Sequence, residues 1–168
     1  MTNSCHICGL GSYVPPKILT NRDLEKLVDT SDEWIMSRTG IRQRHILDSG
    51  VNASDAALVA ARAALTDAGV SAGELTHIFV ATCSPDYFCP STACLVAGRL
   101  GLSARSEGHG AHVMCMDFNA ACSGFLYGLE LARSALALRP DAVVLLIGAE
   151  ALSRRIDFFR SQYLCSVW

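Results

Sequence analysis

Apolar residues along the chain form short continuous runs that alternate with helical repeats. Continuous runs at residues 75–82, 112–118 and 142–149 are typical of strands covered on both faces, and a similar run lies at residues 5–9. Apolar positions recur at helical spacing over 52–68, over 91–101 and onward from 122, as in amphipathic helices. This order predicts an α/β fold with a largely parallel or mixed sheet and helices on both faces.

Capping residues indicate where several of these helices begin and end. Thr20 opens one helix with a capping-box-like start, and Thr30 with Glu33 forms a second capping box. Gly40 supplies the left-handed residue that stops the second helix. Further N-caps are expected at Ser54 and Ser91.

The segment 119–124 joins the strand at 112–118 to a helix that begins near Cys122. Its residues are small, so backbone can pass close to backbone and a sulfur has room to meet a ligand. A thiol in the first turn of a helix lies near the positive end of the helix dipole, which favours the reactive thiolate. The pattern alone fits a nucleophilic cysteine on a strand-turn-helix elbow and a small buried cysteine in a helix–sheet contact equally well.

Trp34 and Arg38 stand one turn apart on the helix that precedes Gly40. An indole beside a guanidinium can hold a planar base, and Arg42 and Arg44 follow closely enough in sequence to contact phosphate. The simpler interpretation of the pattern alone is a half-buried Trp with a surface Arg stacked on it.

Composition limits the classes of function. A chain of 168 residues with 51% hydrophobic content can form one domain with a substantial core. A net charge of -2 with mixed signs gives no basic surface for nucleic acid and no polybasic membrane patch, and no apolar run is long enough to span a membrane. We expect a cytoplasmic protein without a signal peptide, whose eight cysteines stay reduced.

The pair Cys5 and Cys8, with His6 between them, could indicate a metal or redox site. On a strand, however, residues three apart point to opposite faces, and no second pair lies at ligand spacing. We therefore expect no metal. A thiol redox or metal-binding protein remains an alternative class, built on Cys5, Cys8, Cys83, Cys89 and Cys94.

Several segments, taken together with their order and spacing, resemble the amino-terminal half of β-ketoacyl-(acyl carrier protein) synthase III. They are residues 10–15, 30–35, 38–46, 118–125 and 148–150, and the likeness covers about residues 4–157. The resemblance implies a thiolase-like α/β fold, of which residues 1–157 would form the amino-terminal half: a mixed five-stranded sheet with helices on both faces.

The resemblance also implies the reaction that initiates fatty acid synthesis. A short acyl group, such as acetyl, would pass from acyl-CoA to Cys122, and malonyl-acyl carrier protein would then condense with it by decarboxylation. The backbone N–H of Cys122 would help to stabilise the oxyanion. Thr30, Trp34 and Arg38 match the residues that bind CoA. Phe88 and Cys89 lie in the loop that the family uses for the acyl pocket and for contact with a homodimer partner. No cofactor besides the CoA substrate is implied.

Two features of the sequence depart from the family. The malonyl step needs a His and an Asn from the second half of the enzyme, and none of the five histidines here matches that His. Residues 158–168 differ from the family's usual continuation, and deleting a single base from a coding sequence that fits them restores it. We therefore expect 158–168 to be an aberrant, frameshifted tail and the chain by itself to be inactive in full turnover.

Two alternatives lie close to this interpretation. The chain could be a non-catalytic fragment that pairs with a separately encoded second half, or part of a related thiolase-like CoA synthase of secondary metabolism. The segments around Trp34 and Arg38 favour the fatty acid initiator over the second alternative.

Overall fold

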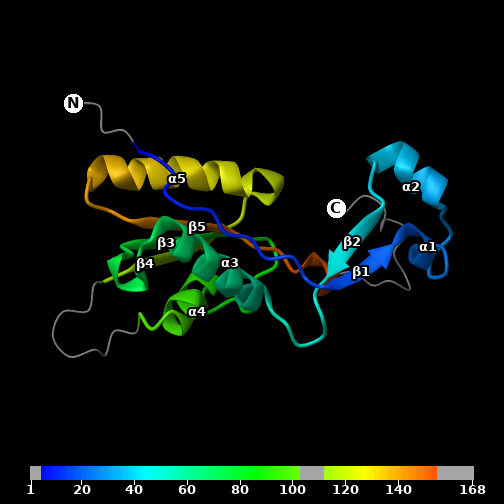
Figure 1. The fold of residues 1–168 in the computed structure, drawn as a ribbon, viewed down its shortest axis with the longest axis horizontal. Coiled ribbons are helices and arrows are strands. Elements are labelled where there is room, and N and C mark those ends of the chain that lie inside the picture. The colour runs from blue at the N-terminus through cyan, green and yellow to red at the C-terminus, as the bar shows by residue number, and fades with distance from the viewer. Residues whose placement is uncertain (1–4, 103–111, 155–168) are drawn as a thin grey trace. The chain divides into compact units, whose positions relative to one another are not determined.

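The structure, a computed structural model, describes residues 5–102 and 112–154. The chain divides into two compact units (Figure 1). Of the described residues, unit 1 contains 5–13, 52–102 and 112–150, and unit 2 contains 14–51 and 151–154. The elbow with Cys122 belongs to unit 1, and the helix with Trp34 and Arg38 belongs to unit 2.

Unit 1 is organised around three parallel strands, β3 (His77–Ala81), β4 (Met114–Phe118) and β5 (Val144–Gly148). β3 lies in the centre, in the order β4-β3-β5. Ala81 pairs with Phe118 on one side and with Gly148 on the other. The three strands therefore end at the same edge of the sheet, and the residues that follow them lie together there.

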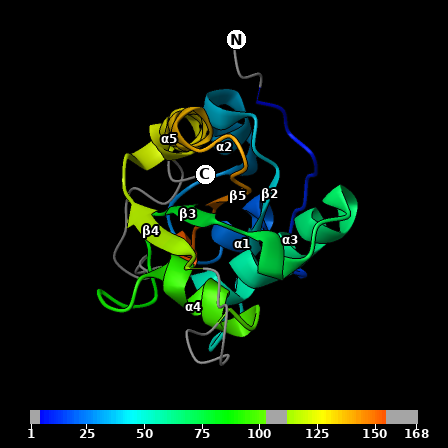
Figure 2. The same cartoon turned by 90° about the vertical axis from the view of Figure 1, so that its left-hand side faces the viewer.

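Helices cover both faces of this sheet (Figures 1 and 2). α5 (Gly124–Leu138) lies on one face, and α3 (Ala53–Ala68) and α4 (Thr92–Arg99) lie on the other. The core lies between the sheet and the α3–α4 layer, where small alanines alternate with branched side chains. It includes Ala57, Leu58, Ala61, Leu75, Ile78, Val80, Val96, Leu145 and Ile147.

α5 approaches the sheet closely because its buried residues are glycines, Gly124 and Gly128. A Cβ at Gly128 would lie 2.4 Å from Leu146 Cδ1 and 2.9 Å from Phe118 Cζ, so only a glycine fits without a shift of its neighbours. The apolar residues Phe125 and Leu129, which recur at helical spacing, are 47% and 40% exposed. The bulky apolar side chains of α5 thus lie mainly outside its contact with the sheet.

The amino end of α4 is tied to strand β4 through Asp117. The Asp117 carboxylate accepts the backbone N–H groups of Thr92 (2.6 Å) and Ala93 (2.8 Å). The hydroxyl of Ser91 accepts the N–H of Cys94 at 3.2 Å, so Ser91 is the expected N-cap. Three of the N–H groups that open a helix without an intrahelical partner are satisfied in this way.

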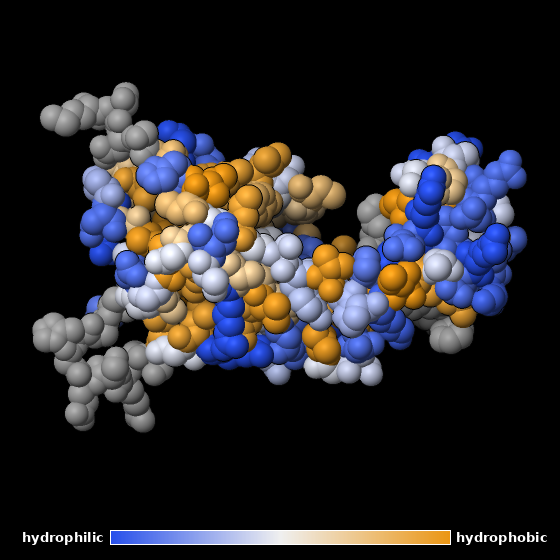
Figure 3. Space-filling view, in the orientation of Figure 1, coloured by the Kyte–Doolittle hydropathy of each residue, from blue (hydrophilic) through white to orange (hydrophobic). Residues whose placement is uncertain are grey.

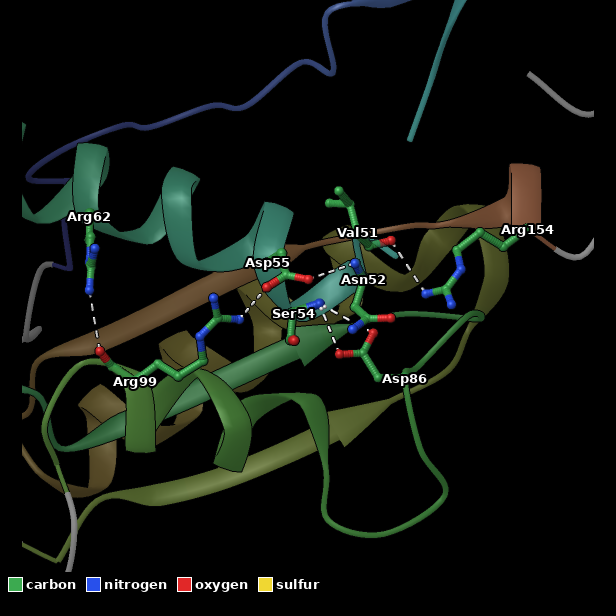
Figure 4. Close-up of polar contacts among 8 residues, drawn as sticks. All are labelled: Val51, Asn52, Ser54, Asp55, Arg62, Asp86, Arg99 and Arg154. Carbon is green, nitrogen blue, oxygen red and sulfur yellow. Dashed lines mark hydrogen bonds and ion pairs between the residues drawn. The ribbon is translucent and has the colours of Figure 1, made fainter. Parts of the chain in front are cut away.

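A polar network joins α3, α4 and the loop after β3 within unit 1 (Figure 4). Asp55 on α3 forms an ion pair with Arg99 on α4 at 2.6 Å. Asp86 in the loop accepts the backbone N–H of Ser54, at the start of α3, at 3.3 Å. These contacts fix the base of the loop that carries Phe88.

Unit 2 pairs β1 (Lys17–Thr20) with β2 (Gln43–Ile46) in antiparallel fashion and carries α1 (Asn21–Leu24) and α2 (Asp32–Thr39). The buried side chain of Asn21 joins these elements. Its amide donates to Asp32 Oδ1 (2.7 Å) and to the Ile41 carbonyl (2.8 Å), and its oxygen accepts from Arg44 Nη1 (2.8 Å). The short turn Leu152–Arg154 also belongs to unit 2, where Arg154 Nη1 donates to the Val51 carbonyl at 3.4 Å (Figure 4).

The α/β class, the helices on both faces and most of the expected elements are confirmed. The expectation of one mixed five-stranded sheet is corrected, because the described strands form a parallel three-stranded sheet and a separate antiparallel pair. The short strands β1 and β2 satisfy each other's hydrogen bonds within unit 2. Among the described strands, β4 lies at an edge of its sheet. Its residues are half-buried or exposed, with Met114 54% exposed, so it is less covered than its apolar run predicts.

Residues 5–9 do not form the expected strand, and the segment 9–11 contacts α3 instead. Cβ atoms at Gly9 and Gly11 would lie 2.6 Å and 2.2 Å from the carbonyl oxygens of Ala64 and Ala60. The Leu10 N–H donates to Asp67 on α3 at 2.9 Å. Glycines let this segment touch the helix backbone, and that contact takes the place of sheet pairing.

Two helix starts also differ from the expected residues. Ser31, rather than Thr30, caps α2, and its hydroxyl accepts the Trp34 N–H at 3.1 Å. Asn52, rather than Ser54, precedes α3, and its N–H donates to Asp55 at 2.7 Å. In the part of the chain that the structure describes, we find no helix with the length and apolar character needed to cross a membrane.

Candidate functional site

Cys122 lies on a strand-turn-helix elbow, as the sequence predicts. The short turn Ala121–Ser123 connects β4 to α5, and Cys122 is exposed at its centre. Ala121, directly before the cysteine, has a φ of 47°. A residue with a Cβ rarely adopts this left-handed conformation, so the surrounding contacts must hold it. The exposure of Cys122 excludes the alternative of a small buried core cysteine.

Polar residues from three strand ends meet beside this elbow. Asn119, just after β4, accepts the N–H of Ala121 (3.0 Å) and the thiol of Cys83 (3.1 Å) on its side-chain oxygen. The backbone N–H of Cys83 donates to Glu150 Oε1 at 2.7 Å, and the Ser84 hydroxyl donates to Glu150 Oε2 at 2.5 Å. A chain of hydrogen bonds therefore runs from Glu150, across the end of β3, to the residue before Cys122.

The electrostatics of this chain keep Cys83 protonated. Loss of water around the sulfur raises the pKa of the Cys83 thiol, and the nearby negative charge of Glu150 raises it further. A hydrogen bond from the Ala121 amide opposes this shift, and proximity to Cys122 adds to it. A thiol that keeps its proton can donate a hydrogen bond, as Cys83 does to Asn119.

Sequence reasoning did not identify Asn119, Cys83 and Glu150 as parts of one cluster. In the sequence, Cys83 stands out only as a possible metal or redox ligand, and Asn119 and Glu150 stand out only as members of family-like segments. Their positions gave a usable signal, since each lies within two residues of the end of a parallel strand. In open α/β sheets, the residues that follow the carboxyl ends of neighbouring strands gather at one edge.

The residues expected to bind CoA lie in unit 2, on and just before α2. Trp34 is 49% exposed, and Arg38, one turn further along the helix, is also exposed. The site expected to contact phosphate needs one correction: Arg44 is buried and donates to Asn21, whereas Arg42 is exposed. Arg44 holds unit 2 together and is not positioned for a ligand at the surface.

The loop after β3 exposes both residues expected at the acyl pocket and dimer contact. Phe88 is 105% exposed and Cys89 is exposed beside it. Cys5 and Cys8 are exposed too, and within residues 5–102 and 112–154 no three His, Cys, Asp or Glu side chains come together as a metal site would require.

Comparisons with known proteins agree with the geometry of the elbow. The profile of the family 3-Oxoacyl-[acyl-carrier-protein (ACP)] synthase III matches residues 116–166, which include Cys122. The β-ketoacyl-[acyl-carrier-protein] synthase III of Nitratidesulfovibrio vulgaris (strain DSM 19637 / Miyazaki F) is 56% identical over 155 residues, which are 92% of this chain and 44% of the relative. By sequence and by fold, the chain is related to β-ketoacyl-[acyl-carrier-protein] synthase III.

Solved structures give the same result for the fold. The 3-oxoacyl-[acyl-carrier-protein] synthase III from Aquifex aeolicus superposes with a TM-score of 0.83 at 42% identity, over 95% of this chain and 49% of that chain. The priming β-ketosynthase of the R1128 polyketide pathway superposes with a TM-score of 0.81 at 29% identity, over 92% of this chain and 44% of that chain. The expected thiolase-like fold is confirmed.

The chain spans under half the length of the curated synthase III relatives that it matches, 44% for the one from Nitratidesulfovibrio vulgaris (strain DSM 19637 / Miyazaki F). The family match ends at residue 166, inside the segment 158–168 that we expected to be aberrant. That segment lies outside the described residues, and the frameshift stays a prediction.

Proposed function

We propose that this chain carries the acyl-accepting cysteine of a condensing enzyme that initiates fatty acid synthesis. The observation that carries the proposal is the exposed Cys122 on a strained elbow at the start of a 15-residue helix, in a relative of synthase III. The whole protein would transfer a short acyl group, such as acetyl, from acyl-CoA to Cys122 and condense it with malonyl-acyl carrier protein.

The first half-reaction can be assigned to residues of this chain. The Cys122 thiolate attacks the carbonyl carbon of the acyl-CoA thioester, and the carbonyl electrons move to oxygen. The N–H of Cys122 lies at the amino end of α5, where helix N–H groups lack intrahelical partners and can stabilise this oxyanion. When the intermediate collapses, the C–S bond to CoA breaks and CoA leaves as a thiolate that takes up a proton from water.

Binding of the CoA moiety is proposed for α2 and for Thr30, two residues before it. The exposed Trp34 ring offers a face on which adenine can stack, and the exposed Arg38 guanidinium supplies positive charge for phosphate. Thr30 lies in the same segment. We assign Phe88 and Cys89 to the acyl pocket and to the contact with a second subunit in a homodimer, on the support of their exposure in the loop after β3.

The second half-reaction is proposed for the whole enzyme. It releases CO₂ from malonyl-acyl carrier protein, and the resulting carbanion displaces Cys122 from the acyl thioester. The resemblance assigns the groups that activate the malonyl thioester to a second half. We further propose that the enzyme works in the cytoplasm, uses no cofactor besides its acyl-CoA substrate, and binds no nucleic acid.

Mass spectrometry of the intact protein tests the first half-reaction. After incubation with acetyl-CoA, the chain should gain the mass of one acetyl group, and Cys122→Ser should not. Cys94→Ser, which removes another exposed cysteine, is the matched control and should acylate normally. Trp34→Ala should raise the acetyl-CoA concentration that gives half the maximal rate without lowering that rate. An adduct that persists in Cys122→Ser would refute the assignment.

The likeness to the R1128 priming β-ketosynthase supports a second candidate, a priming synthase of secondary metabolism. It would use the same cysteine with a different primer. Competition between acetyl-CoA and longer acyl-CoAs for Cys122 distinguishes the two, because a fatty acid initiator with a short primer should prefer acetyl-CoA.

A further inference from the structure

Behind the elbow, side chains from three strand ends form one hydrogen-bonded chain. Cys83 lies two residues past β3, Asn119 one residue past β4, and Glu150 two residues past β5. The strand register aligns these ends, because Ala81 pairs with both Phe118 and Gly148. The chain of contacts reaches Ala121 through the 3.0 Å bond to Asn119.

The orientation of the Asn119 side chain follows from its two partners. The N–H of Ala121 and the thiol of Cys83 are both donors, so the amide oxygen, with its two lone pairs, must face them. A bond from Asn119 to a residue two positions later occurs in many turns. Here the second lone pair accepts from Cys83, 36 positions away and just past the end of β3, so the turn is tied to the end of a neighbouring strand.

We propose that Asn119 and Cys83 are positioning residues for Cys122, and that Glu150 orients Cys83. Ala121, directly before the cysteine, adopts an unfavourable φ of 47°. The side-chain oxygen of Asn119 accepts the Ala121 N–H and stabilises this conformation. Glu150 fixes the backbone of Cys83, whose thiol then fixes Asn119. This inference rests on the proposed acyl transfer to Cys122.

The chemistry explains why such support matters. Attack on a thioester requires the sulfur and the oxyanion donor to be aligned with the carbonyl, and small misplacements cost rate. Alkylation by iodoacetamide requires only a reactive thiolate and has no oxyanion to place. Loss of positioning should therefore slow acylation much more than alkylation.

Three variants, at Asn119 and at Cys83, test the proposal. Asn119→Ala should slow acylation of Cys122 by acetyl-CoA about tenfold, through loss of its hydrogen bonds, and change the rate of alkylation by about threefold or less. Cys83→Ala should slow acylation, whereas Cys83→Ser, which keeps a hydroxyl donor, should restore it. Cys94→Ser serves as the control.

Several results would overturn the proposal. One is equal acylation by Cys83→Ala and Cys83→Ser, and another is a parallel loss of acylation and alkylation in all variants, which would indicate a purely structural role. If Asn119→Ala does not fold, the comparison of Cys83→Ala with Cys83→Ser still tests the proposal.

A separate measurement distinguishes failure of this inference from failure of the proposed function. If the unmodified protein is not acylated, acyl transfer is refuted. Amide hydrogen exchange at Ala121 then tests, independently of acylation, whether Asn119 holds the elbow in place. Exchange should accelerate about tenfold in Asn119→Ala, in line with one lost hydrogen bond. Unchanged exchange would show that Asn119 does not hold the elbow.

Discussion

Removal of the Asp117 carboxylate should loosen the contact between β4 and α4 and destabilise unit 1. The carboxylate accepts two backbone N–H groups, at 2.6 Å and 2.8 Å, at the positive end of a helix. A hydrogen bond to a charged group contributes about 1.5–3 kcal/mol, and water can replace part of this because Asp117 is only partly buried. We therefore expect Asp117→Ala to lower the free energy of unfolding by about 2–4 kcal/mol.

Asp117→Asn should cost about 1–2 kcal/mol, because one oxygen remains but the charge and one acceptor are lost. Asp141→Asn is the matched control: its carboxylate is exposed, 3.4 Å from Arg139, and should contribute about 0–0.5 kcal/mol. Urea unfolding followed by circular dichroism measures all three, and hydrogen exchange at Thr92 and Ala93 localises the effect. Equal stabilities of Asp117→Asn and Asp141→Asn would refute the reasoning.

Three further predictions concern pH, packing and association. The Thr20 hydroxyl and Lys26 hold the pKa of Asp23 at about 2, below its ordinary 3.8. The ionised Asp23 carboxylate therefore stabilises unit 2 fully above about pH 4, and this stabilisation is lost as the pH falls toward about 2. Urea unfolding repeated across that pH range should show the dependence in the unmodified protein and not in Asp23→Asn. Gly128→Ala should destabilise the fold by about 1–3 kcal/mol, because the new Cβ would lie 2.4 Å from Leu146 Cδ1. Gly98→Ala on α4, with open space around it, should stabilise the fold by about 0.5–1 kcal/mol, and thermal unfolding measures both variants. Leu126→Lys should reduce self-association in sedimentation velocity, because Leu126 is 66% exposed on the apolar surface of α5. Val59→Lys on α3 is the control, and a reduction of the same size in that variant would contradict a specific role for α5.

Features that depend on neighbouring residues could be predicted well from the sequence. The Gly40 stop, the Ser91 cap and the start of α5 near Cys122 all follow from side chains within a few positions. The left-handed conformation of Ala121 could not be predicted in this way, since alanine itself disfavours it. It becomes intelligible only with Asn119 in view, whose side chain accepts the Ala121 N–H.

Features that depend on distant residues were missed or assigned wrongly. Glu150 meets Cys83 across 67 positions, and nothing in the local pattern links them. Residues 5–9 have the apolar character of a strand, but the contact of Gly9 and Gly11 with α3 decides their place. Arg44 resembled a phosphate ligand in sequence and proved to be a buried partner of Asn21, because its strand position turns it inward.

The helix after Cys122 illustrates how periodicity can locate a helix without naming its buried face. The sheet is contacted by Gly124 and Gly128, and the larger apolar side chains remain exposed: Phe125, Leu126, Tyr127, Leu129, Leu131 and Leu138. Figure 3 shows hydrophobic surface over α5. Six large apolar side chains exposed on one helix, beside the exposed ion pair of Glu130 and Arg133, exceed the scattered apolar residues of an ordinary protein surface.

We therefore expect the exposed face of α5 to be covered when the protein acts, which agrees with the proposed homodimer and with the association predicted for Leu126. Such a cover would also exclude water from the amino end of α5, which directly follows the turn that carries Cys122. Charges and helix dipoles act more strongly where water is excluded, so the same packing that removes an apolar surface would strengthen stabilisation of the thioester oxyanion. Association and acylation of Cys122 should then rise together with protein concentration.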